Sequence, residues 1–135
     1  MFQGAMNALD PVYTVGGQLE EVLKEHGFDR DCDAKVADSL SKVGLDPAVP
    51  SRYPHEMSGG VKQRVVIAMA LLLEPDLLEA DEPTTVLDVL VQERIMDLLK
   101  KLGREKGVNI ILISHDLALV SQNATKIGIM TPASS

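Results

Sequence analysis

The sequence predicts an α/β fold built on a parallel sheet. Two short apolar runs, residues 77–80 and 109–113, have the length and composition of buried strands, and polar residues follow each run directly. Segments with apolar residues at helical spacing flank both runs. Ligands bind at the carboxyl ends of the strands in open parallel sheets, so the polar residues after each run are candidates for a functional site.

Composition bounds the class of protein. The 135 residues suit one domain of ordinary size, and 45% of them are hydrophobic, which is enough to form a core. The formal net charge of -7 argues against a nucleic-acid partner, because such a surface is normally basic. The single cysteine, Cys32, excludes a disulfide framework and fits a reducing cytoplasm. No signal peptide or membrane-length segment is expected, so membrane association would require a partner.

Two amphipathic helices are predicted early in the chain, over residues 15–25 and 31–42. Gly27 and Gly44 mark their ends, and residues 45–53 contain two prolines and are expected to form a loop. The apolar residues of the two helices recur at helical spacing: Val15, Leu19, Val22 and Leu23 in the first, and Cys32, Val36, Leu40 and Val43 in the second.

A third helix is expected to begin at Ser58 and to be buried, because residues 65–73 are apolar on all sides. Ser58 is a good N-cap, and Gly59 and Gly60 leave the amides of the first turn uncovered by side chains. Free amides and the helix dipole attract anions, which makes this helix start a candidate phosphate site. An ordinary capped helix is the alternative, and Ser-Gly-Gly alone does not distinguish the two.

The strand over residues 77–80 delivers Asp81 and Glu82 to its carboxyl end. One acid at that position can hold a divalent cation, and a second can polarise a water molecule. A further amphipathic helix is predicted from Asp88 to about Lys106.

The branched apolar run over residues 109–113 predicts a strand covered on both faces, and it ends at His115. His115 is a candidate general base, metal ligand or phosphate contact, although a structural polar role explains it equally well. A helix near residues 116–123 and a short strand over residues 126–130 are predicted to follow.

These motifs resemble the nucleotide-binding subunits of ATP-binding cassette (ABC) transporters. Ser58-Gly59-Gly60 is followed about twenty residues later by Asp81-Glu82-Pro83-Thr84-Thr85 and then by Leu87-Asp88. The resemblance implies a partial P-loop NTPase (RecA-like) sheet with an inserted helical subdomain. Residues 7–16 and 53–56 resemble the oligopeptide and dipeptide importers in particular.

The resemblance also implies roles for single residues with ATP and Mg²⁺ as cofactors. Asp81 and Gln3 correspond to contacts of the magnesium ion, and Glu82 to the catalytic base. Gln3 and His115 correspond to residues that bracket the γ-phosphate. The residues that close on the nucleotide of the opposite copy, or lie at the dimer seam, are Ser58, Gly59, Gly60 and Asp88.

Family resemblance further implies partners for the parent subunit. These are a second nucleotide-binding subunit in a head-to-tail dimer, transmembrane permease subunits and, indirectly, a solute-binding protein, at the cytoplasmic face of the cell membrane. Two alternatives remain open. One is an ABC ATPase for another solute, such as a metal ion, and the other is a non-enzymatic fragment or interaction module.

The phosphate-loop motif Gly-x-x-x-x-Gly-Lys-Ser/Thr does not occur in the 135 residues. The resemblance therefore divides the chain into a glutamine loop and helical subdomain (1–57), a part of the ATPase core (58–131) and a tail (132–135). Without this motif the chain alone is expected to be inactive, and its sheet to have a gap between residues 109–113 and 126–130. Because unpaired buried strand edges are unfavourable, the isolated chain is expected to be poorly folded, rearranged or completed by another copy.

Three positions depart from the pattern that the resemblance implies. Glu79 interrupts a strand in place of an aliphatic residue, and a buried unpaired carboxylate is unfavourable or becomes protonated. Gly4 replaces a polar residue after Gln3. Val61 replaces the glutamine of the commonest signature sequence, which matters little because backbone amides form the anion site.

Overall fold

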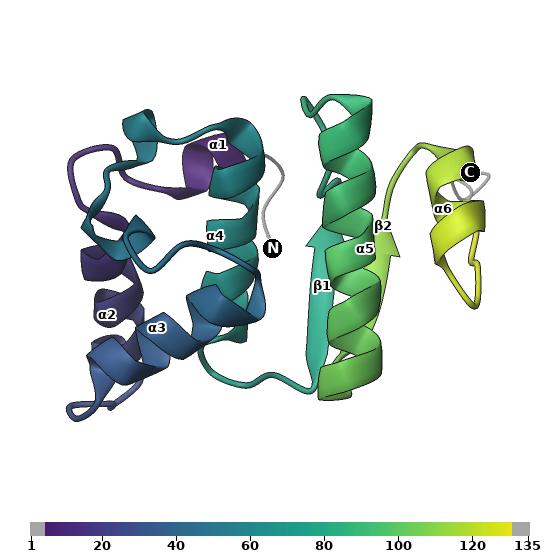
Figure 1. Ribbon diagram of the computed structural model, residues 1–135. Helices are drawn as coiled ribbons and strands as arrows, with labels where there is room; N and C mark the ends of the chain where they lie inside the picture. The colour runs from purple at the N-terminus through teal and green to yellow at the C-terminus, as the bar shows by residue number, and fades with distance from the viewer. Residues whose placement is uncertain (1–4, 131–135) are drawn as a thin grey trace, which may run out of the picture.

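Helices form the first part of the molecule, and a two-stranded sheet with a covering helix forms the second (Figure 1). The computed structural model describes residues 5–130, so Gln3, Gly4 and the predicted tail lie outside it. In chain order the elements are α1 (Ala5–Ala8), α2 (Val15–Glu25), α3 (Cys32–Lys42), η1 (Val49–Ser51), η2 (Pro54–Glu56), α4 (Gly59–Leu71), β1 (Leu77–Asp81), α5 (Val89–Lys106), β2 (Asn109–Ile113) and α6 (Leu117–Asn123).

The two early amphipathic helices are confirmed. α2 has the predicted bounds, and α3 begins one residue later than predicted, at Cys32. Leu19 of α2 and Leu40 of α3 are buried, because the apolar side of each helix packs into a common core. Gly27 and Gly44 follow the two helices with φ angles of 83° and 70°, a conformation that glycine adopts without steric cost.

The third helix, α4, is a core helix as predicted. It contacts α1, α2, α3 and α5, and thereby joins the helical part to the sheet. It ends at Leu71 rather than at Leu73, and Glu74 turns the chain away with a φ of 49°. Four consecutive residues are buried because neighbours surround the helix: Val65, Val66, Ile67 and Ala68.

β1 and β2 are parallel neighbours, and α5 connects them. The register pairs Leu77 with Asn109 and Asp81 with Ile113. α5 covers one face of the sheet with an apolar side that includes Leu99. Figure 1 shows that both strands point toward the end of the molecule at which α4 and α5 begin.

The other face of the sheet is open, so the prediction that the second strand is covered on both faces is wrong. Leu77, Ile111 and Ile113 on this face are 53%, 48% and 43% exposed. Glu79 is also exposed on it, so the expected burial of its carboxylate is not observed. The reason is that no element within residues 5–130 packs there. We call this surface the open face, and by strand alternation and register it is formed by Leu77, Glu79, Asp81, Asn109, Ile111 and Ile113.

The predicted strand over residues 126–130 is also wrong, because this segment forms neither a strand nor a helix. In the part of the chain that the structure describes, the sheet has two strands, and residues 126–130 pair with neither of them. The strand expected to lie between this segment and residues 109–113 is the one that carries the missing phosphate-loop motif. Ile127 is 54% exposed and Ile129 is 78% exposed. An apolar, branched composition is therefore not sufficient for a strand without a neighbouring strand.

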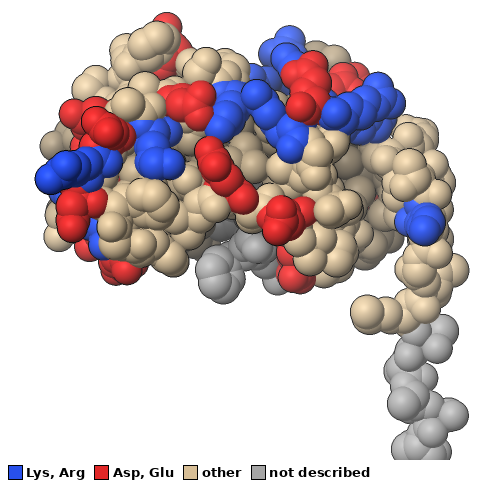
Figure 2. All heavy atoms as spheres, turned by 90° about the horizontal axis from the view of Figure 1, so that it is seen from below, with Lys and Arg blue, Asp and Glu red and all other residues tan. Residues whose placement is uncertain are grey.

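Charged side chains of both signs are interspersed on the face of the molecule shown in Figure 2. Lys and Arg do not form one continuous basic surface on this face. Among the helices of residues 5–130, none combines the length and the apolar character needed to cross a bilayer.

Candidate functional site

The carboxyl ends of β1 and β2 bring together residues that are 33 positions apart in the sequence. Because Asp81 pairs with Ile113, the residues that follow each strand emerge side by side. The backbone N–H of Glu82 donates to the carbonyl of Ile113 at 2.8 Å, which extends the contact between the strands by one residue. The strand register thereby places Glu82 next to His115.

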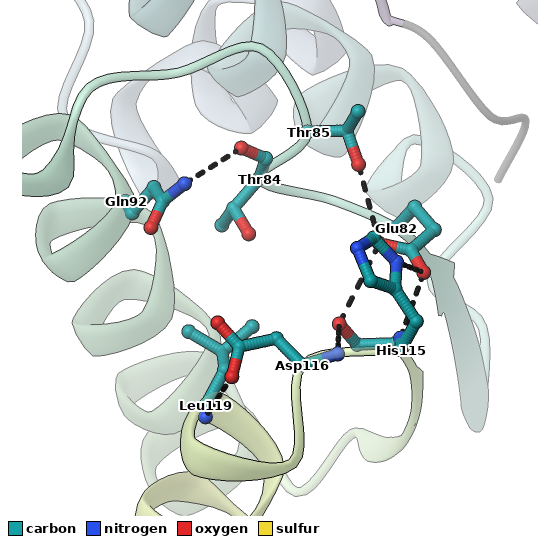
Figure 3. A network of polar contacts seen from close by, with 8 residues as sticks. Glu82, Thr84, Thr85, Gln92, His115, Asp116 and Leu119 are labelled. Carbon is teal, nitrogen blue, oxygen red and sulfur yellow. Dashed lines mark hydrogen bonds and ion pairs between the residues drawn. The ribbon is translucent and has the colours of Figure 1, made fainter.

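Hydrogen-bond donors surround the carboxylate of Glu82 (Figure 3). Oε1 lies 2.7 Å from Nδ1 of His115 and accepts the backbone N–H of the same residue at 2.9 Å. Oε2 accepts the hydroxyl of Thr85 at 3.2 Å and that of Ser114 at 3.5 Å. The side chain of Glu82 is 12% exposed, whereas that of His115 is 85% exposed. The imidazole therefore forms the solvent side of the contact.

The contact favours the charged forms of both partners. Burial raises the pKa of Glu82, whereas the hydrogen bonds from the ring and backbone of His115 and from Thr85 lower it. The hydrogen bonds together outweigh burial, so the pKa lies below its ordinary value of 4.5. The hydrogen bond to Glu82, together with its negative charge, raises the pKa of His115 above the ordinary value of 6.5. At mildly acidic pH, Glu82 is therefore negatively charged and His115 is positively charged.

The loop after Glu82 is held in an uncommon conformation. Glu82 and Val86 have φ angles of 47° and 70°, in the left-handed region that few residues other than glycine adopt. The side-chain amide of Gln92 on α5 donates to the carbonyls of Thr84 and Leu87 at 3.2 and 3.1 Å, as Figure 3 shows for Thr84. Gln92 thus fixes the loop from the following helix.

Asp81 lies beside this network at the end of β1. It is partly exposed, and its carboxylate makes no hydrogen bond or ion pair with any residue in the range 5–130. Magnesium commonly takes one or two protein carboxylates and completes its octahedron with phosphate oxygens and water, so a single free carboxylate suits it. Gln3, the second predicted magnesium contact, lies outside the described residues. No cluster of three or more His, Cys, Asp or Glu able to hold a metal occurs within residues 5–130.

The start of α4 has the predicted cap. The hydroxyl of Ser58 accepts the backbone N–H of Val61 at 3.5 Å. Ser58 is exposed, and Gly59 and Gly60 are partly exposed, so the first turn lies at the surface. Asp88 caps α5 in the same way and accepts the N–H of Val91 at 3.0 Å.

Gly60 is also required for packing. A Cβ atom on this residue would lie 2.7 Å from Cγ1 of Val91 on α5, far inside van der Waals contact. The start of α4 therefore packs directly against the first turn of α5. Packing alone thus demands a glycine at a position that the anion-site prediction had also singled out.

The candidate site is a surface and not an enclosed cavity. Two hollows of about 270 Å³ each lie between the helical part and α5, and neither is lined by Glu82, His115 or Ser58. A ligand at these residues would therefore need a second surface to enclose it.

Three residues of the site escaped the sequence analysis. Ser114 and Thr85 contact the Glu82 carboxylate, and Gln92 holds the loop. The only available signal was their closeness in sequence to the predicted acids and histidine, which does not distinguish them from ordinary surface polar residues.

The chain is similar in sequence to a known family and to proteins of named function. Residues 2–85 match the family model described as ABC transporter. The chain is 48% identical over 134 residues to the dipeptide transport ATP-binding protein DppD of Bacillus subtilis, and 48% identical over 136 residues to DppD of Escherichia coli. It is 43% identical over 134 residues to a putative peptide import ATP-binding protein of Brucella ovis. Each match covers 96% of this chain but only 40% or 41% of the relative.

Solved structures agree with the sequence matches. The dimeric structure of a bacterial ABC transporter cassette has a TM-score of 0.70 and 30% identity, with 90% of this chain and 53% of that chain covered. A post-hydrolysis state of that cassette, bound to ADP and Pi, has a TM-score of 0.68 and 30% identity, with 87% and 52% covered. The chain thus spans about two fifths of the curated relatives and about half of the solved cassettes.

Gly60→Ala is expected to destabilise the chain by about 1–3 kcal/mol, because the added Cβ overlaps the stiff side chain of Val91. Gly103→Ala is the matched control, since its Cβ would meet the nearest atom at an ordinary 3.5 Å and alanine favours a helix. Urea unfolding monitored by circular dichroism measures the free energy of unfolding of both variants. In a chain that carries Val91→Ala, the substitution Gly60→Ala should cost much less stability, because the overlapping methyl group is gone. An equal loss of stability in the presence and absence of Val91→Ala would contradict the packing explanation.

Glu82→Gln is expected to lower the pKa of His115 toward 6.5, because the negative charge that raises it is removed. NMR titration of the ring signals of His115 measures this change. The contribution of His115 to stability is lost as pH rises through its raised pKa, and that of Glu82 as pH falls through its lowered pKa. The difference in free energy of unfolding between the unaltered chain and Glu82→Gln should therefore be largest between pH 4.5 and 6.5. A pH-independent difference would contradict the ion pair.

Proposed function

Because the chain belongs to the ABC transporter family, we propose that it forms part of the ATP-binding and ATP-hydrolysing subunit of an importer for dipeptides or oligopeptides. The contact between Glu82 and His115 at the ends of two parallel strands carries the proposal, since it joins an acid and an exposed cationic donor where ligands bind. The names of the relatives support the peptide substrates. The transport activity named for the relatives belongs to proteins of which this chain spans about two fifths.

In the proposed reaction, Glu82 orients and polarises the water molecule that attacks the γ-phosphate of ATP. The imidazolium of His115 contacts the γ-phosphate, and the raised pKa of this residue suits an anionic ligand. Asp81 would hold Mg²⁺, and the ion would supply positive charge to neutralise the phosphate groups of ATP. Gln3 is proposed as a further contact of the metal and phosphate.

The signature residues are proposed to act on the nucleotide of a second subunit. Ser58, Gly59 and Gly60 present first-turn amides at the surface, and Asp88 caps the neighbouring helix. The open character of the site supports a second surface that encloses the nucleotide, and a related cassette has been solved as a dimer. We infer a head-to-tail dimer in which each ATP lies between two copies.

The helical part is proposed to carry the motion of hydrolysis to the membrane. We propose that residues 1–57 form the glutamine loop and helical subdomain, that residues 58–131 belong to the ATPase core and that residues 132–135 are a tail. α4 contacts helices of both parts, which supports a mechanical connection between them. Permease subunits at the cytoplasmic face of the cell membrane would receive this motion, with a solute-binding protein acting through them.

A non-enzymatic role is the second candidate, and the missing phosphate-loop motif favours it for these 135 residues in isolation. In that case the chain contributes its signature and acids only when another polypeptide holds the nucleotide. An ABC ATPase for another solute has no comparable support.

Glu82→Gln in the complete subunit is expected to reduce ATP turnover by about 10²–10⁴-fold, because the group that polarises the attacking water is lost. ATP-bound dimer should accumulate, which light scattering detects in the presence of ATP and Mg²⁺. Glu105→Gln on the exposed end of α5 is the control and should hydrolyse ATP at the normal rate. Undiminished turnover in Glu82→Gln would refute the role assigned to this residue.

A further inference from the structure

One of the two hollows between the helical part and α5 carries an excess of positive charge. It has a volume of about 270 Å³, and its charged lining residues are Lys42, Arg64, Arg94, Lys101 and a single acid, Asp97. The other hollow has the same volume but is lined by two lysines and two acids, so its charges balance. We call the first one the basic hollow. Such a group of cations stands out in a chain whose formal net charge is -7.

Residues of α5 line one side of the basic hollow. Arg94, Asp97, Leu98 and Lys101 follow the i, i+3, i+4, i+7 pattern, so they lie on one face of this helix. Arg94 and Lys101 are exposed, and neither forms an ion pair with a carboxylate in the range 5–130. About 10 Å of helix axis separates the two residues. One ligand can therefore meet them at two different points.

The helical part lines the other side, and its two cations are held in place. Nη1 of Arg64 on α4 donates to the carbonyl of Val43 at 3.2 Å, which leaves most of the five guanidinium donors for another acceptor. Nζ of Lys42 lies 2.6 Å from Oδ2 of Asp38, so an acid outside the hollow already balances this lysine. The excess of positive charge therefore comes from Arg64, Arg94 and Lys101.

These features favour a small anion with more than one charged group. Guanidinium and ammonium groups donate strong, charge-assisted hydrogen bonds to phosphate oxygens, and a bound anion would relieve the repulsion between the cations. The volume of about 270 Å³ lies at the lower end of the range for ligand pockets, which favours a compact ligand. The negative net charge of the chain disfavours a broad anionic surface, such as a membrane or a nucleic acid.

We propose that the basic hollow binds a soluble anion with two or more linked phosphate groups, of which inorganic pyrophosphate is the smallest. Its phosphate groups contact Arg64 of α4 on one side and Arg94 and Lys101 of α5 on the other. An occupant thereby joins the helical part to α5. Because neither Glu82 nor Ser58 lines this hollow, the site is separate from the proposed nucleotide site, and the inference goes beyond the proposed function.

Isothermal titration calorimetry of the 135-residue chain with sodium pyrophosphate, without Mg²⁺ and without ATP, tests the inference. The double variant Arg94→Gln/Lys101→Gln should bind about tenfold more weakly, because two charge-assisted contacts are lost. Asp97→Asn should bind about threefold more tightly, because the one acid of the hollow no longer repels the anion. A gain of affinity cannot result from a damaged fold, so this variant keeps the test decisive.

Arg30→Gln/Lys126→Gln is the matched control, since it removes the same charge from two exposed residues that do not line the hollow. It should bind pyrophosphate as tightly as the unaltered chain. Absence of saturable binding, an equal loss of affinity in both double variants, or no gain in Asp97→Asn would overturn the inference. Sedimentation with phosphatidylglycerol vesicles that Arg94→Gln/Lys101→Gln abolishes would also overturn it, because the occupant would then be a lipid surface. None of these results depends on ATP hydrolysis, so they are separable from a failure of the proposed function.

Discussion

The parallel register of β1 and β2 is the constraint on which the candidate site depends. Because Asp81 lies opposite Ile113, the next residues on each strand meet, and the carboxylate of Glu82 reaches the ring and the backbone of His115. A register shift by one residue would turn every side chain of the shifted strand to the opposite face. The pairing of two five-residue strands therefore decides whether the acid and the histidine form one site or two unrelated groups.

Packing and function impose overlapping demands on the rest of the site. Gly60 leaves an amide uncovered at the start of α4 and also makes room for Val91 on α5, while Gln92 on the same helix holds the loop after Glu82. α5 thus contacts both the start of α4, which carries Gly60, and the loop that follows Glu82. The left-handed backbone of Glu82 fits this arrangement, because strained residues persist where their surroundings hold them.

Local patterns predicted the helices well and the sheet only in part. The bounds of α2 and β2 follow from periodicity and composition, which act within each segment. Three predictions were wrong for one common reason: the covered second face of the sheet, the burial of Glu79 and the strand over residues 126–130. Each of these features needs a neighbouring element that residues 5–130 do not supply. The roles of Glu82 and His115 came from family resemblance, and their contact required the fold. Ser114, Thr85 and Gln92 could not be predicted, because short polar residues carry no periodic signal.

We propose that these residues supply the acids, the histidine and the signature of an ATP-binding cassette, whereas the 135 residues contain no Gly-x-x-x-x-Gly-Lys-Ser/Thr motif to cradle the nucleotide. Equilibrium dialysis of the purified 135-residue chain against radiolabelled ATP with Mg²⁺ tests this claim most directly. We predict no saturable binding at micromolar ATP, because the exposed residues around Glu82 and His115 do not enclose the phosphates. Saturable micromolar binding of one ATP by the monomeric chain would contradict the account.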